Sequence, residues 1–306
     1  MYKKRWLCIA AVNRFMKFFR VLRRAVVLLL ALSLFGCASA PKPEFNAVDL
    51  PVELSESSGL LCMGDEFVSF NDSGGLPVLY RFNAAGQILQ QLELSVRNID
   101  WEAITSDGQF LYLADTGNNA GKRTSVLIHK IPLDWRMLKQ PYQPVTLEIT
   151  LPQQGALKAY QHDLDFEALV YQQGALWLIS KSWASQQPQR YRLDPSLKFQ
   201  ALGKALPLQA PDFLVTDASF NSSTEQWWLV GYTNPYKAIW AYITNSGFQA
   251  QIARYDAQFQ LLEVQTLPTQ GQVEGLCIDQ WQQIWISEEA GKQKPARLIK
   301  TGLSSR

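Results

Sequence analysis

Histidine, cysteine and enzyme signature motifs are all scarce in this chain of 306 residues. Its only histidines are His129 and His162, and neither a Gly-x-Ser-x-Gly nor a His-Glu-x-x-His motif occurs. Those motifs mark many serine hydrolases and zinc proteases, so their absence argues against these two classes. We expect a packing role for His129 in an outer strand and an ordinary loop position for His162, with the channel mouth as its alternative. Whether the protein is an enzyme stays open, and we assign no catalytic residue.

Acidic residues are absent from the first 36 positions, which carry eight of the 29 basic residues. An apolar run from Ala25 to Leu32 follows the basic stretch. It is shorter than the roughly 20 apolar residues that cross a bilayer comfortably. A basic segment, a short apolar core and small residues near a cleavage point are typical of a secretory signal. Residues 1–36 are therefore predicted to be a signal peptide, with Met16 as an alternative start to Met1.

The signal ends in Leu34-Phe35-Gly36-Cys37, which resembles the bacterial lipobox. The resemblance implies cleavage before Cys37 and diacylation of its thiol, and two or more acyl chains anchor a protein stably. An ordinary signal peptide with an incidental cysteine, or an uncleaved anchor, is the alternative. Residue 38 is alanine rather than aspartate, which by analogy favours the outer membrane, facing the periplasm. Residues 37–44 form a short flexible tether.

The charge of the chain changes sign once the signal is removed. Taking eight basic residues from 29 leaves 21 against 27 acidic ones, so the mature protein has a net charge near −6. No basic stripe remains, which argues against a nucleic-acid partner. Residues 45–306 contain no linker-like break and are predicted to form one domain.

Five short segments of the mature chain share one pattern: a polar or acidic residue, a small residue, then usually an aliphatic one. They are Ser58-Gly59-Leu60, Glu102-Ala103-Ile104, Glu167-Ala168-Leu169, Asp217-Ala218-Ser219 and Glu274-Gly275-Leu276. A β-rich run and a polar turn follow each segment, and the turn comes 13 to 15 residues after the first motif residue. The nearly constant step indicates equivalent structural positions.

Further strand-like runs separate the motifs, whose starts lie 44, 65, 50 and 57 residues apart. Four strands per unit at this period predict an all-β fold, a β-propeller of five blades. The last unit is one strand short, and residues 45–54 are expected to supply it and close the ring. A sixth blade within residues 248–268 is the alternative. Residues 199–202 are expected to belong to the third blade.

The repeated motifs, with Asp-Trp-Glu at 100–102 and Asp-Phe-Glu at 165–167, resemble the bacterial SdiA-regulated-domain family, relatives of the NHL-repeat propellers. The resemblance covers roughly residues 50–300. It implies a five-bladed propeller with a bound calcium ion, and it supplies no established activity. Asp217-Ala218-Ser219 departs from the usual pattern, which puts the fourth blade in most doubt.

Innermost strands line the centre of a propeller, so equivalent motif residues are expected to form a ring. Carboxylates that converge in this way repel one another, and a calcium ion with its six to eight oxygen ligands would relieve the repulsion. The alternative is a structural ring whose carboxylates accept backbone N–H groups and join neighbouring blades. The predicted metal ligands are Glu102, Glu167, Asp217, Glu274 and Asp115. The predicted channel-lining residues are Ser58, Asp72, Lys181 and Glu288.

Cys62 and Cys277 fall in the innermost strands of the first and last blades, which a closed propeller makes neighbours. Their positions differ by one residue relative to the motif, so they are expected on opposite strand faces as two buried free thiols. A bulge in one strand would remove that obstacle and allow a disulfide.

Two functions follow from these observations. The first is a binding or scaffold module, anchored to the membrane through Cys37, that presents one face to an envelope protein or a small ligand. The second is a calcium-dependent hydrolase of a phosphoester or lactone that uses the carboxylates at the channel mouth, which rests on analogy between propellers alone. A purely structural role is a third.

Overall fold

The computed structural model describes residues 45–152, 157–233, 248–292 and 294–306. All of them belong to one compact unit of residues 43–306. The predicted signal peptide 1–36, Cys37 and the tether 37–44 lie outside the described residues and remain predictions. Within the part of the chain that the structure describes, no helix has the length and apolarity to span a membrane.

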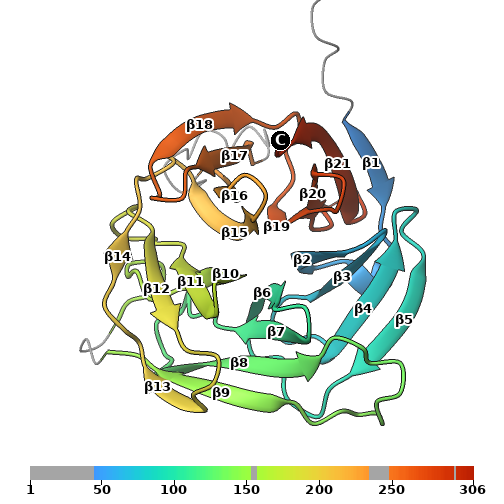
Figure 1. Cartoon of the computed structure of the whole chain (residues 1–306), viewed down its shortest axis with the longest axis horizontal. Helices are drawn as coiled ribbons and strands as arrows, with labels where there is room; N and C mark the ends of the chain where they lie inside the picture. The colour runs from blue at the N-terminus through green and yellow to red at the C-terminus, as the bar shows by residue number, and fades with distance from the viewer. Residues whose placement is uncertain (1–44, 153–156, 234–247, 293) are drawn as a thin grey trace, which may run out of the picture. The chain divides into compact units, whose positions relative to one another are not determined.

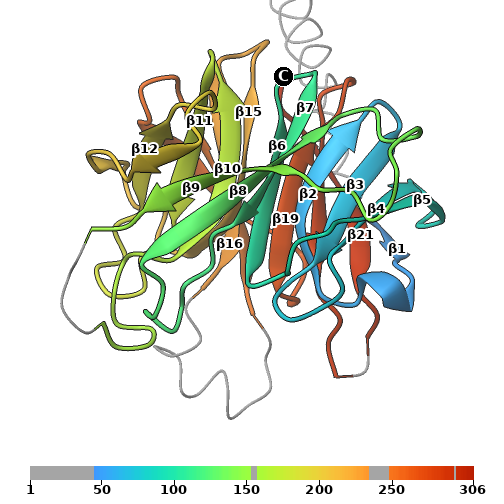
Figure 2. The same ribbon diagram turned by 90° about the horizontal axis from the view of Figure 1, so that it is seen from below.

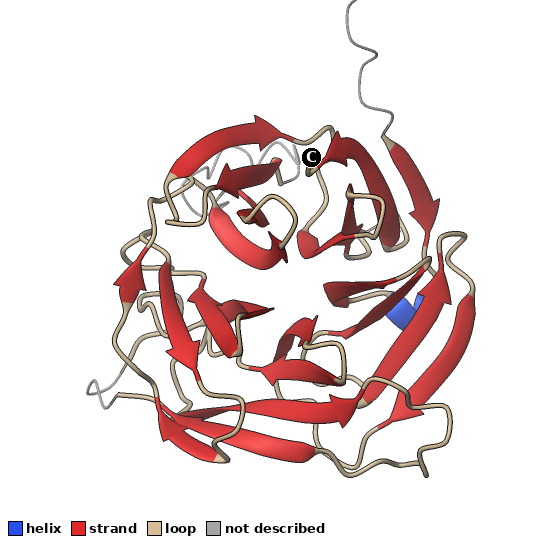
Figure 3. Ribbon diagram, viewed as in Figure 1, coloured by secondary structure: helices blue, strands red, loops and turns tan. Residues whose placement is uncertain are grey.

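Five sheets, antiparallel except for one edge pair, surround a common axis, and the one short helix described is η1 (Val52–Leu54) (Figures 1 and 3). The fold is a five-bladed β-propeller, as the repeat predicts. Blade one consists of β2 (Ser57–Met63), β3 (Glu66–Asn71), β4 (Val78–Asn83) and β5 (Ile88–Glu93). Blade two consists of β6 (Trp101–Ser106), β7 (Phe110–Asp115), β8 (Ser125–Pro132) and β9 (Val145–Thr150). Blade three consists of β10 (Phe166–Gln172), β11 (Ala175–Ser180), β12 (Gln189–Leu193) and β14 (Leu206–Pro207).

The last two blades complete the ring. Blade four consists of β15 (Leu214–Asn221), β16 (Gln226–Tyr232), β17 (Ala250–Tyr255) and β18 (Leu261–Thr266). Blade five consists of β19 (Val273–Ile278), β20 (Gln283–Glu288), β21 (Arg297–Ser304) and β1 (Asn46–Asp49). β1 pairs with β21 from Asn46↔Lys300 to Asp49↔Arg297, so the N-terminal strand closes the ring as predicted. The alternative of a sixth blade is wrong, because residues 248–268 form the outer strands of blade four.

One strand lies in a different blade from the one predicted. β13 (Phe199–Ala201) leaves blade three and pairs in parallel with β9 at the outer edge of blade two. Two backbone bonds extend the pairing, from Glu148 N–H to the Lys198 carbonyl and from Leu202 N–H to the Thr150 carbonyl, both 2.8 Å long. The crossing covers an otherwise open sheet edge, a benefit that the sequence pattern of residues 199–202 does not reveal.

Burial decreases from the axis outward and explains the sequence pattern of each strand. The first four residues of β2, β6 and β10 are buried on both faces, whereas the outermost strands β5 and β18 alternate or are mostly exposed. The described core forms five apolar clusters, and each cluster lies between two consecutive blades. Five interfaces between five blades make the ring continuous.

A register irregularity lies near the start of every innermost strand. In β6, β10 and β19 the extra residue is the glutamate of the motif, at 102, 167 and 274. In β15 it is Thr216, and in β2 the irregularity falls between Ser58 and Leu61. Such a β-bulge re-aims the side chain of the inserted residue, so its position decides which side chains turn toward the axis.

The expectation of two free thiols is wrong, because Cys62 and Cys277 form a disulfide with their Cα atoms 5.5 Å apart. The bulge in β2 falls after the motif residue Ser58, whereas the bulge in β19 falls on Glu274 itself. The two strands therefore do not keep a common register beyond the motif. Cys62 lies one position further from its motif residue than Cys277 does. Because the two bulges differ in position, this offset places the two cysteines next to each other.

Candidate functional site

Seen from the side, the strands run side by side between two sets of loops (Figure 2). The innermost strands all begin at the same end of the propeller axis. Carboxyl groups gather at this end, and their charges act on one another. We call this group the acidic cluster. It comprises Asp72, Asp100, Glu102, Asp165, Glu167, Glu274 and Glu289.

The bulges select three of the five predicted ring positions for the acidic cluster. Glu102, Glu167 and Glu274 are buried bulge residues that belong to the cluster. In blade four the bulge residue is Thr216, whose hydroxyl donates to the Val273 carbonyl at 2.5 Å. Asp217 therefore occupies the position that alanine or glycine holds in blades two, three and five, one residue later than predicted.

Asp217 joins neighbouring blades with its carboxylate. One oxygen accepts the Leu276 backbone N–H of blade five at 2.7 Å, and the other accepts the Ala218 N–H at 2.8 Å. Burial raises the pKa of Asp217 well above its ordinary value, while the backbone N–H groups, that of Leu60 in blade one included, oppose the rise. This arrangement matches the structural alternative for the ring. Ser58 also links blades, because its hydroxyl donates to the Glu102 carbonyl at 3.3 Å.

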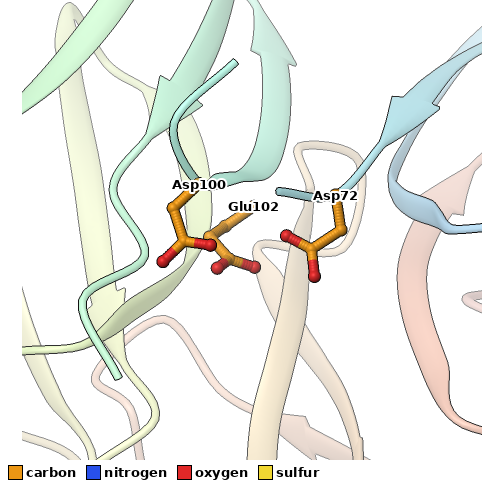
Figure 4. Close-up of side chains that lie close together, drawn as sticks. All are labelled: Asp72, Asp100 and Glu102. Atoms are coloured by element: carbon orange, nitrogen blue, oxygen red, sulfur yellow. The ribbon is translucent and has the colours of Figure 1, made fainter. Parts of the chain in front are cut away.

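Asp72, Asp100 and Glu102 form the most compact part of the acidic cluster. Each offers one carboxylate oxygen, and these oxygens all lie within 4.8 Å of one another. Figure 4 shows the three carboxylates turned toward a common space, Asp72 from the end of β3 and the other two from the start of β6. A β-carbon at Gly117 would lie 2.5 Å from the Asp100 carboxyl carbon and would also meet Glu102. The absence of a side chain at Gly117 thus makes room for the carboxylates.

These three carboxyl groups have only partial compensation, from the Ser73 backbone N–H and the more distant charges of Lys181 and Arg123. None forms an ion pair with a described residue, and the buried Oδ1 of Asp72 has no hydrogen-bond partner. Burial, together with the charges of Asp72 and Asp165, raises the pKa of Asp100 to about 7. Burial and the neighbouring carboxylates, Glu167 first, raise the pKa of Glu102 well above its ordinary value. Burial also raises the pKa of Asp72.

The other half of the acidic cluster surrounds Lys181. The Lys181 ammonium lies 3.1 Å from Glu167 Oε1, and both side chains are buried. It also faces the rings of Trp183 and Tyr232, at 4.9 and 5.4 Å from their centroids. Burial alone would lower the pKa of Lys181, but the surrounding charges, Glu167 first, hold that pKa well above its ordinary value. Lys181 is therefore charged and neutralises part of this half.

Polar donors satisfy the remaining carboxylates around Lys181. Asp165 accepts the Asn118 N–H at 2.5 Å and the Trp183 indole N–H at 2.6 Å. The Gln272 amide donates to Glu289 at 3.1 Å and to Glu274 at 3.4 Å. Burial, followed by the charge of Glu274, nevertheless raises the pKa of Glu289 to about 8.

Asp115, a predicted metal ligand, and Glu288, a predicted channel-lining residue, lie next to the acidic cluster, and the charge of Asp115 acts on Asp100. Each is the last residue of the second strand of its blade and pairs with an arginine of the same blade. Asp115 Oδ1 lies 2.7 Å from Arg123 Nη1, and Glu288 Oε2 lies 2.5 Å from Arg297 Nη2. Burial by itself would raise the pKa of Asp115, but His129 and Arg123 together lower it. The residue that reaches the cluster is the one directly after the second strand of the blade. It is Lys181 after β11 in blade three and Glu289 after β20 in blade five.

Sequence reasoning therefore missed Asp100, Asp165 and Glu289 as site residues. A signal for the first two was present, because Asp-x-Glu occurs at both 100–102 and 165–167. Residues two apart on a strand share a face, so the aspartate beside each glutamate was a candidate. Glu289 directly follows Glu288, and only the strand pairing shows which of the two reaches the cluster.

Both histidines are buried and hold local structure. His129 Nδ1 lies 3.0 Å from the Thr146 hydroxyl, and its Nε2 lies 3.8 Å from Asp115 Oδ2. His162 Nδ1 accepts the Leu164 N–H at 3.1 Å. The packing role expected of His129 matches this placement in β8, whereas His162 is more enclosed than an ordinary loop histidine.

No family model and no curated protein matches the chain. The resemblance to the SdiA-regulated-domain family therefore stays a prediction. Among solved structures, the chain is similar to virginiamycin B lyase from Staphylococcus aureus (15% identity, 83% of this chain and 69% of that one, TM-score 0.38). It is also similar to a luciferin-regenerating enzyme (8%, 84% and 95%, 0.44) and to a hypothetical protein from Leishmania major (11%, 83% and 89%, 0.47). These likenesses carry no argument about function.

Proposed function

We propose that this protein is a lipid-anchored binding module of the cell envelope whose acidic cluster holds a calcium ion. The anchor is Cys37, and the location is the outer membrane, facing the periplasm. The partner is an envelope protein or a small ligand that reaches the end of the propeller carrying the cluster.

One observation carries the metal proposal: three carboxylates converge within 4.8 Å without an ion pair to any described residue, and a buried oxygen of Asp72 has no hydrogen-bond partner. A buried acceptor without a partner is costly, and a cation of the right size removes that cost. The carboxylates of Asp72, Asp100 and Glu102 supply only oxygen donors, which calcium prefers. The space beside Gly117 keeps these carboxylates free of a packing side chain.

A binding function fits this half of the cluster better than catalysis. When bound, calcium would neutralise the carboxylates and offer remaining coordination positions to oxygen atoms of a ligand. Asp72, Asp100 and Glu102 would hold the ion. Neither histidine belongs to the acidic cluster, so a hydrolase would have to use one of its carboxylates as the base.

The direct test is isothermal titration of EDTA-treated protein with calcium, together with thermal unfolding in calcium and in EDTA. We expect measurable heat and a higher Tm in calcium, because an ion that binds only the folded state stabilises it by mass action. Asp100→Asn should weaken binding at least tenfold. Asp65→Asn is the matched control, since Asp65 is an exposed aspartate in the β2–β3 turn, away from the cluster.

Absence of heat and of any Tm difference in the metal-free protein would remove the metal from the proposal. Equal affinities of the two aspartate variants would move the metal away from Asp100. A panel of phosphoesters and lactones, assayed with calcium and with EDTA, tests the hydrolase alternative. Calcium-dependent turnover that Asp100→Asn abolishes would replace the binding function by a catalytic one.

A further inference from the structure

The propeller ring is closed in two places, by the β1–β21 pairing at the outer edge and by the disulfide Cys62–Cys277 near the axis. Cys62 lies in β2, the innermost strand of blade one, and Cys277 lies in β19, the innermost strand of blade five. β2 and β19 belong to separate sheets and share no ladder of hydrogen bonds. The disulfide is therefore a covalent closure near the axis, whereas the β1–β21 ladder closes the ring at the outer edge.

A cavity of about 180 Å³ opens beside this disulfide, at the end of the axis away from the acidic cluster. All five innermost strands contribute to its lining, which includes both cysteines. Polar atoms form most of the surface that faces the cavity, and Thr105, Ser106 and Ser219 stand among aliphatic and aromatic lining residues. A cavity of this size admits a small molecule and excludes a folded protein.

The two sulfur atoms of the disulfide are not equally protected. Cys62 is half-buried, whereas Cys277 is 3% exposed and packs in the apolar cluster between blades five and one. A nucleophile that enters the cavity therefore meets the sulfur of Cys62 first. Accessibility is one of the factors that decide which sulfur of a disulfide is attacked.

We propose that the cavity is a thiol–disulfide exchange site at which low-molecular-weight thiols open the inner closure of the ring. The proposal is independent of the calcium site, because it concerns the opposite end of the axis. The outer closure remains when the disulfide is open, so the ring is held by β1 and β21 while β2 and β19 separate more easily.

The chemistry consumes two thiols for each disulfide. A thiolate attacks Cys62 Sγ, a mixed disulfide forms there, and the electron pair of the broken bond leaves on Cys277 Sγ, which takes up a proton. A second thiolate then attacks the sulfur of the bound small molecule. This step releases the oxidised small-molecule disulfide, and the sulfur of Cys62 leaves and takes up a proton. Two protein thiols and one small-molecule disulfide result.

The test measures how fast the folded protein is reduced by thiols of increasing size. The mature chain is incubated with 2-mercaptoethanol, glutathione or a thiol attached to dextran, and free cysteines are counted by mass spectrometry after alkylation. We expect a rate that is first order in the small thiol and at least tenfold lower for the dextran thiol at equal thiolate concentration. Hydrogen exchange of the reduced protein should increase in β2 and β19.

Two leucine variants separate entry through the cavity from reduction after unfolding. Ser219→Leu narrows the cavity, whereas Ser222→Leu makes the same change at an exposed turn residue outside the lining. We expect Ser219→Leu to slow reduction by small thiols at least tenfold and Ser222→Leu to leave it unchanged. If Ser219→Leu does not fold, Ser106→Leu and the size series on the unchanged protein carry the test. Equal rates for all thiols, independent of their concentration, would show that reduction follows global unfolding and would overturn the proposal.

Discussion

The two halves of the acidic cluster, one around Lys181 and the other formed by Asp72, Asp100 and Glu102, place equivalent glutamates in different electrostatic surroundings. Glu102 and Glu167 are both bulge residues at the start of an innermost strand, and both are buried. Glu167 has the Lys181 ammonium at 3.1 Å, whereas Glu102 forms no ion pair with a described residue and has oxygens of Asp72 and Asp100 within 4.8 Å. The position that Lys181 holds after β11 in blade three is held by the uncharged Thr116 after β7 in blade two. A single position in the repeat thus decides which half contains a cationic side chain of its own.

The largest expected effect comes from making the Lys181 half resemble the other one. Lys181→Met keeps most of the side-chain volume and removes the charge that faces Glu167. Breaking a buried ion pair by removing one partner typically costs about 3–5 kcal/mol of unfolding free energy, because the other charge stays buried. Urea unfolding in EDTA measures the loss, and Lys204→Met at an exposed position is the control. A loss no larger than that of the control would mean that Lys181 does not compensate Glu167.

The second expected effect is a fall in the stability of the metal-free protein as pH rises. The pKa of Asp100 is about 7 and that of Glu289 about 8 in the folded state, above the ordinary carboxyl values of 3.8 and 4.5. The folded state therefore holds protons that the unfolded state has released. The resulting stability is fully present below about pH 4 and is lost as pH rises through about 7 to 8.

Between pH 5 and pH 8 the loss should be about 2 kcal/mol for Asp100 alone, after allowance for its partial exposure. Urea titrations at fixed pH in EDTA measure it. Asp100→Asn should flatten the dependence, and saturating calcium should do the same if the ion binds ionised carboxylates. A metal-free protein whose stability does not change over this range would contradict the comparison between the two halves.

The third effect distinguishes Asp217, a predicted metal ligand, from the proposed ligands Asp72, Asp100 and Glu102. Asp217→Asn places an amide among backbone N–H donors that need acceptors, at Leu276 and Ala218. Leaving a buried donor unsatisfied costs about 1–3 kcal/mol, so we expect a loss near 2 kcal/mol. The loss should be equal in calcium and in EDTA, as measured by denaturant unfolding, and the calcium affinity should not change. An affinity that falls as far as in Asp100→Asn would make Asp217 a metal ligand after all.

Sequence alone predicted the architecture well because the signal repeats. Five motifs, their period and the short last unit indicated five blades and closure by residues 45–54, and the structure confirms both. A mistake in one repeat could not alter that conclusion, because the other repeats carried the same information. The β13 crossing is the exception, since nothing in the repeat marks a strand that pairs with the preceding blade.

The site was less predictable because its geometry depends on single-residue shifts. The bulge falls on Thr216 rather than Asp217, and the residue that reaches the acidic cluster is Glu289 rather than Glu288. A bulge adds one residue to one strand without any composition signal, yet it moves every later side chain to the other face. The same kind of shift brings Cys62 and Cys277 together. Fold-level repeats therefore survive an error of one residue, and site assignments do not.

The smallest expected effect concerns the space that the half formed by Asp72, Asp100 and Glu102 keeps beside Gly117. Gly117→Ala places a methyl group against the carboxylates of Asp100 and Glu102. Overpacking of this kind costs at least about 1 kcal/mol, and here we expect roughly that amount as a loss of calcium-induced stabilisation. Thermal unfolding in calcium and in EDTA gives the difference for each variant.

The control for Gly117→Ala is Gly203→Ala, an exposed glycine at which the new β-carbon would only touch the Arg192 carbonyl oxygen at 3.6 Å. Gly203→Ala should leave the calcium-induced stabilisation unchanged. If both variants keep it unchanged, Asp100 and Glu102 can move apart without cost, and the ion does not depend on their close approach. If only Gly117→Ala reduces it, the carboxylates must stay close together, and the backbone without a side chain at residue 117 is part of what makes this half of the cluster able to bind a cation.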